Sequence, residues 1–345
     1  MNTKNTKSAI IILLMVANIF FIYSIITLNI RTQNLPSSMI DNAVNILGNR
    51  GFSIDRSVIP AKKPANYIYE GVYSGDFKEI VAAFSGVPED EIQDLPPLLD
   101  EKTKYNEGGY TFIFDRSDYF KISIMNEYHE KAEDDYREVE TETEAEIAFL
   151  TETGGITAVQ KSDIKRTEKI IDDFLKKYPN RQKSQNQEIK SDFGFDIISL
   201  RKEGGSEPEK VEKVIINQKA DGLPVSSHTA YVEIKSGEVQ YFYGRWYFGV
   251  FVARYKPSLL DSVNILFKYI EYTEKDGNIS GEDTDDADNS DDLDNSVNSV
   301  KLTKMDLEYN IFHISSNEFY LIPSWTLLFD DGKKLSYNMI TGKRN

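Results

Sequence analysis

The chain has 345 residues, no cysteine and a formal net charge of −16 from 40 basic and 56 acidic residues. The acidic surplus argues against nucleic acid and anionic lipid headgroups as partners. The lack of cysteine excludes disulfides, thiolate metal sites and a lipoprotein anchor, so packing alone must stabilise the fold. The length is sufficient for two modest domains with cores of their own.

Residues 9–30 form an apolar stretch that no charged side chain interrupts. A helix of this length, at about 1.5 Å per residue, crosses a hydrocarbon core of roughly 30 Å. Lys4 and Lys7 precede the stretch and only Arg31 closely follows it, which places residues 1–8 in the cytoplasm and the rest outside. Because no small-residue cleavage site follows, we predict a retained transmembrane helix of a single-pass cell-membrane protein rather than a signal peptide.

Helical patterns follow the apolar stretch. Ile40, Val44 and Leu47 recur at helical spacing, which predicts a short juxtamembrane helix. Asp76 and Glu79 have the spacing of a capping box and predict the start of a second short helix.

We expect residues 37–180 to form a first extracellular lobe of mixed α+β structure. Aromatic and β-branched residues predict strands at 67–73, 110–114 and 119–124, the last two as a hairpin. Thr167 is the expected N-cap of a helix that ends before Pro179. A polar stretch then separates this lobe from the next.

Residues 191–345 are the predicted second lobe. Strands at 229–235 and 238–243 flank Ser236-Gly237, which is typical of a hairpin. Alternation predicts that Val239, Tyr241 and Tyr243 share one face of the second strand.

A helix and a further hairpin complete this lobe. The helix is expected at 258–270, with Ser258 as its N-cap, and the closing hairpin joins 319–329 to 334–340. Gly332 supplies the positive φ that a tight turn needs. The fold class predicted for the whole chain is α+β, with one N-terminal transmembrane helix and two lobes, each a mostly antiparallel sheet packed against one or two helices.

Residues 271–298 are rich in Asp, Ser and Asn, with almost no large apolar residue. This composition predicts a solvated, disordered insertion. Several aspartates between Asp283 and Asp294 invite a calcium interpretation. Since the central Gly and terminal Glu of an EF-hand loop are missing, we do not expect calcium there.

The sequence nominates no catalytic, cofactor-binding or metal-binding residue. It has no Gly-x-Ser-x-Gly motif and no phosphate-binding glycine loop. His129, His228 and His313 stand far apart and outside any close metal-ligand pair. A cell-envelope hydrolase would need convergent carboxylates in a deep pocket, and the many carboxylates here single out no pair.

Aromatic residues are the other conspicuous group. Tyr243, Trp246 and Phe248 follow one another closely, and Trp325 lies in a strand that is apolar on both faces. Such rings are core and cross-strand contacts in most sheets, and we favour that interpretation. The alternative is a ligand-binding module for a cell-envelope glycan or lipid. An exposed groove lined by the first three rings would favour the module, and their burial would favour a regulator.

Asn18 lies near the middle of the apolar stretch. A lone amide there gains by hydrogen bonding to another helix, which points to a partner within the membrane. A tolerated polar residue is the equally open alternative.

Seven residues stand in a characteristic order along the second half of the chain: Pro224, Pro323, Trp325, Gly332, Tyr337, Asn338 and Gly342. Their order resembles that of the YycI family. Residues 1–30 add a similar anchor, with a mid-span Asn18 followed by Phe20 and Phe21. The resemblance covers the anchor and roughly residues 215–345, and the middle matches only in general plan.

The resemblance implies a non-enzymatic regulator of the YycFG (WalRK) two-component system of Gram-positive bacteria, which controls cell-wall metabolism. It implies a YycH-like partner and a sensor histidine kinase, reached through transmembrane and extracellular contacts to which Asn18, Phe20 and Phe21 contribute. No cofactor is implied. The acidic insertion and the long first lobe depart from the family pattern. These departures affect the expected partner surfaces more than the expected fold.

Overall fold

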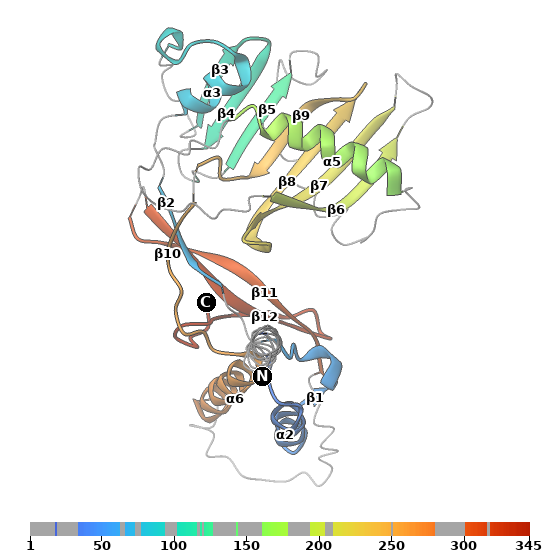
Figure 1. The fold of residues 1–345 in the computed structure, drawn as a ribbon, viewed down its shortest axis with the longest axis vertical. Coiled ribbons are helices and arrows are strands. Elements are labelled where there is room, and N and C mark those ends of the chain that lie inside the picture. Colours follow the sequence, from blue (N-terminus) through green and yellow to red (C-terminus); the bar gives the residue numbers. More distant parts are fainter. Residues whose placement is uncertain are drawn as a thin grey trace, which may run out of the picture. The chain divides into compact units, whose positions relative to one another are not determined.

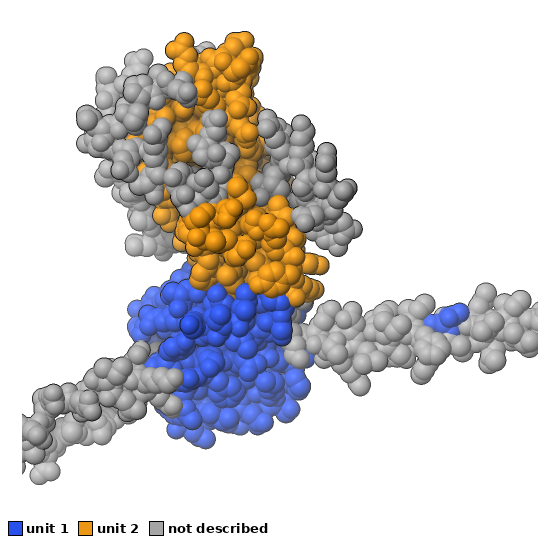
Figure 2. All heavy atoms as spheres, turned by 90° about the vertical axis from the view of Figure 1, so that its left-hand side faces the viewer, with its two compact units in different colours: residues 1–66, 257–306, 324–345 blue, residues 67–256, 307–323 orange. Residues whose placement is uncertain are grey.

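The computed structural model describes residues 18, 34–62, 66–72, 77–93, 102–115, 118, 121–126, 143, 161–178, 194–203, 210–249, 251–279, 301–315 and 318–345. These residues form a mixed structure of helices and mainly antiparallel strands (Figure 1). The mixed helix and strand content expected from the sequence is therefore confirmed. The chain divides into two compact units, shown in different colours in Figure 2.

The predicted transmembrane helix lies outside the described residues, apart from Asn18. That residue is helical and its side chain is exposed. Among the helices that the structure describes, none combines the length and the apolar character needed to cross a membrane. Phe20, Phe21, His129 and residues 280–300 also lie outside the described part of the chain.

The two units do not follow chain order. The smaller unit comprises residues 1–66, 257–306 and 324–345, and the larger unit comprises 67–256 and 307–323. This division differs from the boundary expected between residues 180 and 191. Pairing between strands that are far apart in the sequence decides the division, and local periodicity does not reveal such pairing.

The larger unit is built on an antiparallel sheet with the strand order β6-β7-β8-β9-β5-β4-β3. Figure 1 shows α5 (Lys161–Leu175) lying across β7, β8 and β9, while α3 (Lys78–Ser85) contacts β3 and β4. The strands are β3 Lys102–Glu107, β4 Tyr110–Asp115, β5 Lys121–Asn126, β6 Gly194–Glu203, β7 Val211–Ala220, β8 Leu223–Lys235 and β9 Glu238–Arg245. The predicted hairpins at β4–β5 and β8–β9 are confirmed.

The core of this unit lies between the sheet and its two helices. Phe84 of α3 contacts Phe174 of α5, and Phe174 contacts Phe242 of β9. All three belong to one buried apolar cluster that extends from Phe77 to Phe248. The helices therefore share one core although 75 residues of sequence lie between them.

Alternation along β9 fails at one position. The register of β8 with β9 shifts between Glu233 and Ile234, which makes Gln240 the extra residue of a bulge. As a result Val239 packs in the cluster beneath α5, while Tyr241 packs in a second buried cluster. The prediction that these two residues share a face is wrong, because a single inserted residue reverses the sides of a strand.

A second group of strands belongs to the same unit. β2 (Ile68–Val72) lies between β10 (Phe251–Tyr255) and residues 318–321, which begin β12 (Glu318–Phe329). Gly71 pairs with Phe251 on one side and Phe319 on the other. An added Cβ at this glycine would lie 2.1 Å from Cζ of the Phe319 ring, so any larger residue forces that ring to move.

The smaller unit contains α2 (Ser37–Gly48), α6 (Ser262–Ile279), the first part of β11 (Lys301–His313) and the closing hairpin of β12 with β13 (Lys334–Asn338). The short elements β1 (Ser53–Ile54) and η1 (Arg56–Val58) both contact α2. The remaining short element, η2 (Glu89–Glu91), belongs to the larger unit. A helix at the position expected after the apolar stretch and the closing hairpin are thus confirmed. Trp325 is buried and its indole N–H donates to the carbonyl of Leu260 over 3.2 Å.

The predicted helix starts are wrong in three places. The N-cap of α3 is Phe77, with no side-chain cap. Thr167 lies inside α5 rather than at its start, because its hydroxyl donates to the buried Glu212 carboxylate. Asp261 rather than Ser258 accepts the first-turn N–H of α6.

The end of α6 also differs from expectation. The helix continues to Ile279, so residues 271–279 of the predicted disordered insertion are helical. Tyr272 in this extension contacts the ring of Tyr337 at a centroid distance of 6.1 Å. A ring contact of this kind stabilises a helical turn whose composition alone favours a loop.

Replacing Gly71 by Ala is expected to lower the free energy of unfolding by about 1 to 3 kcal/mol, because the new methyl group overpacks the Phe319 ring. Chemical denaturation followed by circular dichroism measures this change. Gly194→Ala is the matched control, since no atom lies within 4 Å of its added Cβ. Equal effects of the two substitutions would contradict the close packing at Gly71.

Candidate functional site

The aromatic segment at the end of β9 is divided between the two faces of the sheet. Tyr243 packs in the buried cluster with Tyr231 and Tyr241, whereas Trp246 and Phe248 pack in the cluster beneath α5. Tyr243, Trp246 and Phe248 expose only 2%, 6% and 7% of their surface. They therefore form no common open platform.

Two polar side chains hold the segment after β9 in place. The Gln218 amide donates to the carbonyl of Tyr247 over 2.8 Å and accepts from its N–H over 3.1 Å. The Tyr247 hydroxyl in turn donates to the carbonyl of Val72 over 3.0 Å and accepts from its N–H over 3.1 Å. Burial raises the pKa of Tyr247, so this hydroxyl keeps the proton that it donates.

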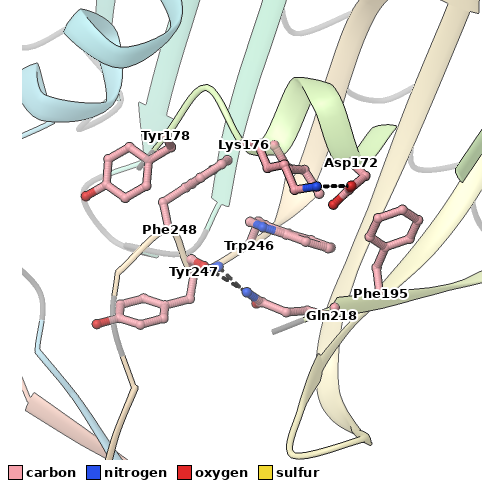
Figure 3. Close-up of a pocket in the computed structure, with 10 residues that line it drawn as sticks. Asp172, Lys176, Tyr178, Phe195, Gln218, Trp246, Tyr247 and Phe248 are labelled. Carbon is pink, nitrogen blue, oxygen red and sulfur yellow. Dashed lines mark hydrogen bonds and ion pairs between the residues drawn. The ribbon is translucent and has the colours of Figure 1, made fainter. Parts of the chain in front are cut away.

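A small pocket lies between the C-terminal half of α5, the start of β6 and this segment (Figure 3). We call it the α5 pocket, and its volume is about 200 Å³. It is lined by Asp172, Leu175, Lys176, Tyr178, Gly194, Phe195, Gln218, Trp246, Tyr247 and Phe248. A wider depression of about 480 Å³ shares Asp172, Gly194 and Phe195 with it and leads along α5.

The polar groups of the α5 pocket are mostly engaged. Lys176 forms an ion pair with Asp172 one helical turn earlier, and this pair raises the pKa of the lysine. Gln218 uses its amide on Tyr247. Figure 3 draws no interaction from the indole nitrogen of Trp246 to any residue that lines the pocket. Within this set of lining residues the Trp246 N–H, which can only donate, therefore has no acceptor.

A buried ionic group fixes the position of α5 over the sheet. Glu212 on β7 is buried, and its carboxylate accepts from Arg166 and, over 2.7 Å, from Thr167. Lys202 on β6 lies 3.8 Å from Glu212 and 2.6 Å from Asp163 of α5, and its hydrogen bond lowers the pKa of Asp163. These contacts hold the helix that forms one wall of the pocket.

The sequence analysis missed most of the residues that line the pocket. Phe195 and Gln218 lie directly opposite each other in the β6–β7 register, and Asp172 comes from a separate helix. No local motif connects them. The usable signal was the aromatic run that ends in Trp246 and Phe248, which predicted a core and not a pocket within it.

The family-motif residues occupy both units. Pro224 lies in β8 and Pro323 in β12, whereas the other five lie in the smaller unit. Trp325 pairs with Tyr337 across the closing hairpin, and Gly332 forms its turn with a φ of 81°. The Asn338 side chain accepts from the N–H groups of Ile340 and Thr341 over 2.9 and 3.2 Å. Gly342 follows with a φ of 68°.

The described histidines form no shared site. His228 is buried on β8 and its Nδ1–H donates to the carbonyl of Ser226 over 3.4 Å, while His313 is exposed. Burial lowers the pKa of His228 to about 3. Among the residues that the structure describes, no three His, Cys, Asp or Glu side chains gather as metal ligands.

The sequence matches no protein-family model and no curated protein. Among solved structures, the chain is similar to a crystal structure of an uncharacterized protein from Eubacterium rectale. The two share 9% identity at a TM-score of 0.37, over 85% of this chain and 89% of that one. A likeness of this degree carries no argument about fold or function, and membership of the YycI family stays a prediction.

His228 predicts a specific pH dependence of stability. Its folded pKa of about 3 lies below the ordinary value of 6.5, so the unfolded chain binds the proton first as the pH falls. The contribution of neutral His228 to stability is therefore fully present above the ordinary pKa of 6.5, and it is lost as the pH falls toward the folded pKa. Between about pH 7.5 and 5.5 the protein should lose about 1.4 kcal/mol that His228→Gln does not lose. Denaturant titrations measure this difference, with the exposed His313→Gln as control. Parallel losses in all three proteins would contradict it.

Gln218→Leu is expected to lower the free energy of unfolding by about 2 to 4 kcal/mol, because it leaves the N–H and the carbonyl of Tyr247 without partners. Thermal and chemical denaturation measure the loss. The neighbouring Asn217→Leu is the control. In the described part of the chain its side-chain oxygen is buried without a hydrogen-bond partner, so its removal should cost little. A similar cost at both positions would argue against the Gln218 contacts.

Proposed function

We propose that this protein is a membrane-anchored, non-enzymatic regulator of a sensor histidine kinase in a two-component system that controls cell-wall metabolism. The resemblance of the anchor and of residues 215–345 to the YycI family supports this function. The proposal includes a transmembrane helix at residues 9–30, a two-lobed ectodomain outside the cell and a YycH-like partner. No catalytic residue is part of it.

Burial of the aromatic segment is the observation that carries the choice. Tyr243 packs on one side of β9, whereas Trp246 and Phe248 pack on the other side. A glycan or lipid platform requires such rings together on an accessible surface. Rings that are buried in two separate clusters stabilise the domain and offer no shared surface to a glycan or a lipid. This favours a protein that acts through protein contacts over the alternative module.

Regulation of this kind is a coupling between contact surfaces and the conformations of the kinase. A difference of about 1 to 3 kcal/mol in binding to two kinase states is sufficient to change its activity severalfold. Contacts along a single transmembrane helix can supply a difference of this size. The mechanism therefore requires no bound cofactor and no chemical step by this chain.

Crosslinking in native membranes tests the function directly. The full-length protein and a version without residues 1–31 are each crosslinked and purified, and their partners are identified by mass spectrometry. Recovery of a sensor kinase and a YycH-like protein with the full-length chain only is the expected result. Recovery of neither by the full-length chain would overturn the proposal.

Asn18→Leu is expected to weaken recovery of the kinase about 3- to 30-fold, since an interhelical hydrogen bond contributes about 0.6 to 2 kcal/mol. Quantitative co-purification and kinase autophosphorylation measure the effect. Thr27→Leu, which also replaces a polar residue of the apolar stretch by leucine, serves as the control. Unchanged recovery and unchanged autophosphorylation would remove Asn18 from the mechanism.

A further inference from the structure

We propose that the α5 pocket binds a neutral aromatic compound of one ring that carries a single hydrogen-bond acceptor. This assigns a small-molecule site to the larger unit and goes beyond regulation through protein contacts. Size sets the first limit on the ligand. The pocket measures about 200 Å³, and an engineered apolar cavity of about 150 Å³ accommodates benzene. One ring with a small substituent therefore fills the pocket, whereas a glycan or a long acyl chain exceeds it.

The walls of the pocket favour an aromatic ring. Figure 3 shows the rings of Tyr178, Phe195, Trp246 and Phe248 around the pocket, and Leu175 adds an aliphatic wall. Aromatic rings pack well against one another in offset or edge-to-face arrangements. The residues around the pocket already do so, with Tyr178 against Phe248 at a centroid distance of 5.7 Å. A ligand ring continues this packing.

The charged residues at the pocket favour a neutral ligand. Asp172 and Lys176 are the charged residues among its described lining, and they form an ion pair with each other. Both side chains are largely exposed, at 69% for Lys176 and 48% for Asp172, and neutralise each other in solvent. A carboxylate or ammonium group placed among the aromatic rings would lose its hydration without meeting an unpaired counter-ion there.

The polar groups that line the pocket favour a ligand with one hydrogen-bond acceptor. Gln218 and the Tyr247 hydroxyl are both engaged with backbone groups. The Trp246 ring is 6% exposed, and Figure 3 draws no partner for its N–H among the residues that line the pocket. A carbonyl or ether oxygen on the ligand ring would accept from this N–H, whereas a purely apolar ligand would leave it unused.

Acetophenone and ethylbenzene are a matched pair of probes, since they are alike in size and differ in the acceptor oxygen. The full chain is labelled with ¹⁵N at tryptophan, which yields one indole signal for each of its two tryptophans. The signals are assigned with Trp246→Phe and Trp325→Phe. Titration with acetophenone is expected to move the Trp246 signal and leave the Trp325 signal in place.

Calorimetry completes the test. Acetophenone is expected to bind the unaltered protein about five- to tenfold more tightly than ethylbenzene, and benzoate more weakly than either. Trp246→Phe should bring the ratio of the first two affinities to about one, whereas Trp325→Phe should preserve it. Retained affinity of Trp246→Phe for ethylbenzene shows that its pocket is still folded, because that ligand needs only the apolar walls.

Three results would overturn the proposal. The first is the absence of any movement of the Trp246 signal, or equal movement of both tryptophan signals. The second is equal affinity for acetophenone and ethylbenzene in the unaltered protein. The third is preferred binding of benzoate. None of these results depends on the kinase, so the pocket and the proposed regulatory function can fail separately.

Discussion

The pairing of β5 with β9 is the constraint on which the larger unit depends. It sets Ile124 opposite Phe242 and Ile122 opposite Gly244, and so joins two sets of antiparallel strands into one sheet. The joined face carries both α3 and α5 and buries one apolar cluster drawn from both sets. A short stack of strands without this partner would leave its apolar face in water. Gly244 suits the junction, because an added Cβ would lie 2.3 Å from the carbonyl of Thr229.

Polar contacts then decide where α5 lies on that sheet. Apolar packing of Ile171 and Phe174 is favourable, but because it is non-directional it does not fix the position of the helix. The buried carboxylate of Glu212 has direction, because a displaced helix would leave its charge without Arg166 and Thr167. Such a group contributes less to stability than to position, since desolvation offsets much of its attraction. The α5 pocket is the space that this fixed position leaves above Phe195 and Trp246.

Local sequence patterns predicted the elements better than their assembly. The hairpin turns were predictable because Ser236-Gly237 and Gly332 must adopt positive φ, and the alternation beside them is strong. Helix starts were not, since Thr167 forms its hydrogen bond with a residue forty-five positions away in the chain. No local sequence pattern indicated the bulge at Gln240. This bulge placed Val239 and Tyr241 on opposite faces of the strand, where alternation predicted a shared face.

The same distinction applies to the candidate site. Trp246 and Phe248 were conspicuous in the sequence, and their burial followed from ordinary core packing. Gln218, Phe195 and Asp172 were not conspicuous, because each belongs to a different element and only the fold brings them together. A site made of one residue from each of several elements is invisible to any argument based on spacing.

β6 carries a bulge at Ile198, because its register with β7 shifts between Ile197 and Ser199. This bulge affects how copies of the chain can associate. In the described part of the chain β6 pairs with β7 alone, which leaves the other side of a ten-residue strand as a sheet edge. Flat edges recruit further strands, and a neighbouring apolar pocket would add to the attraction. The extra residue at Ile198 twists this edge, and the charges of Arg201 and Glu203 would have to lose water for a new strand to dock. The protein can therefore keep an apolar pocket beside an open strand and still resist growth of the sheet from one molecule to the next.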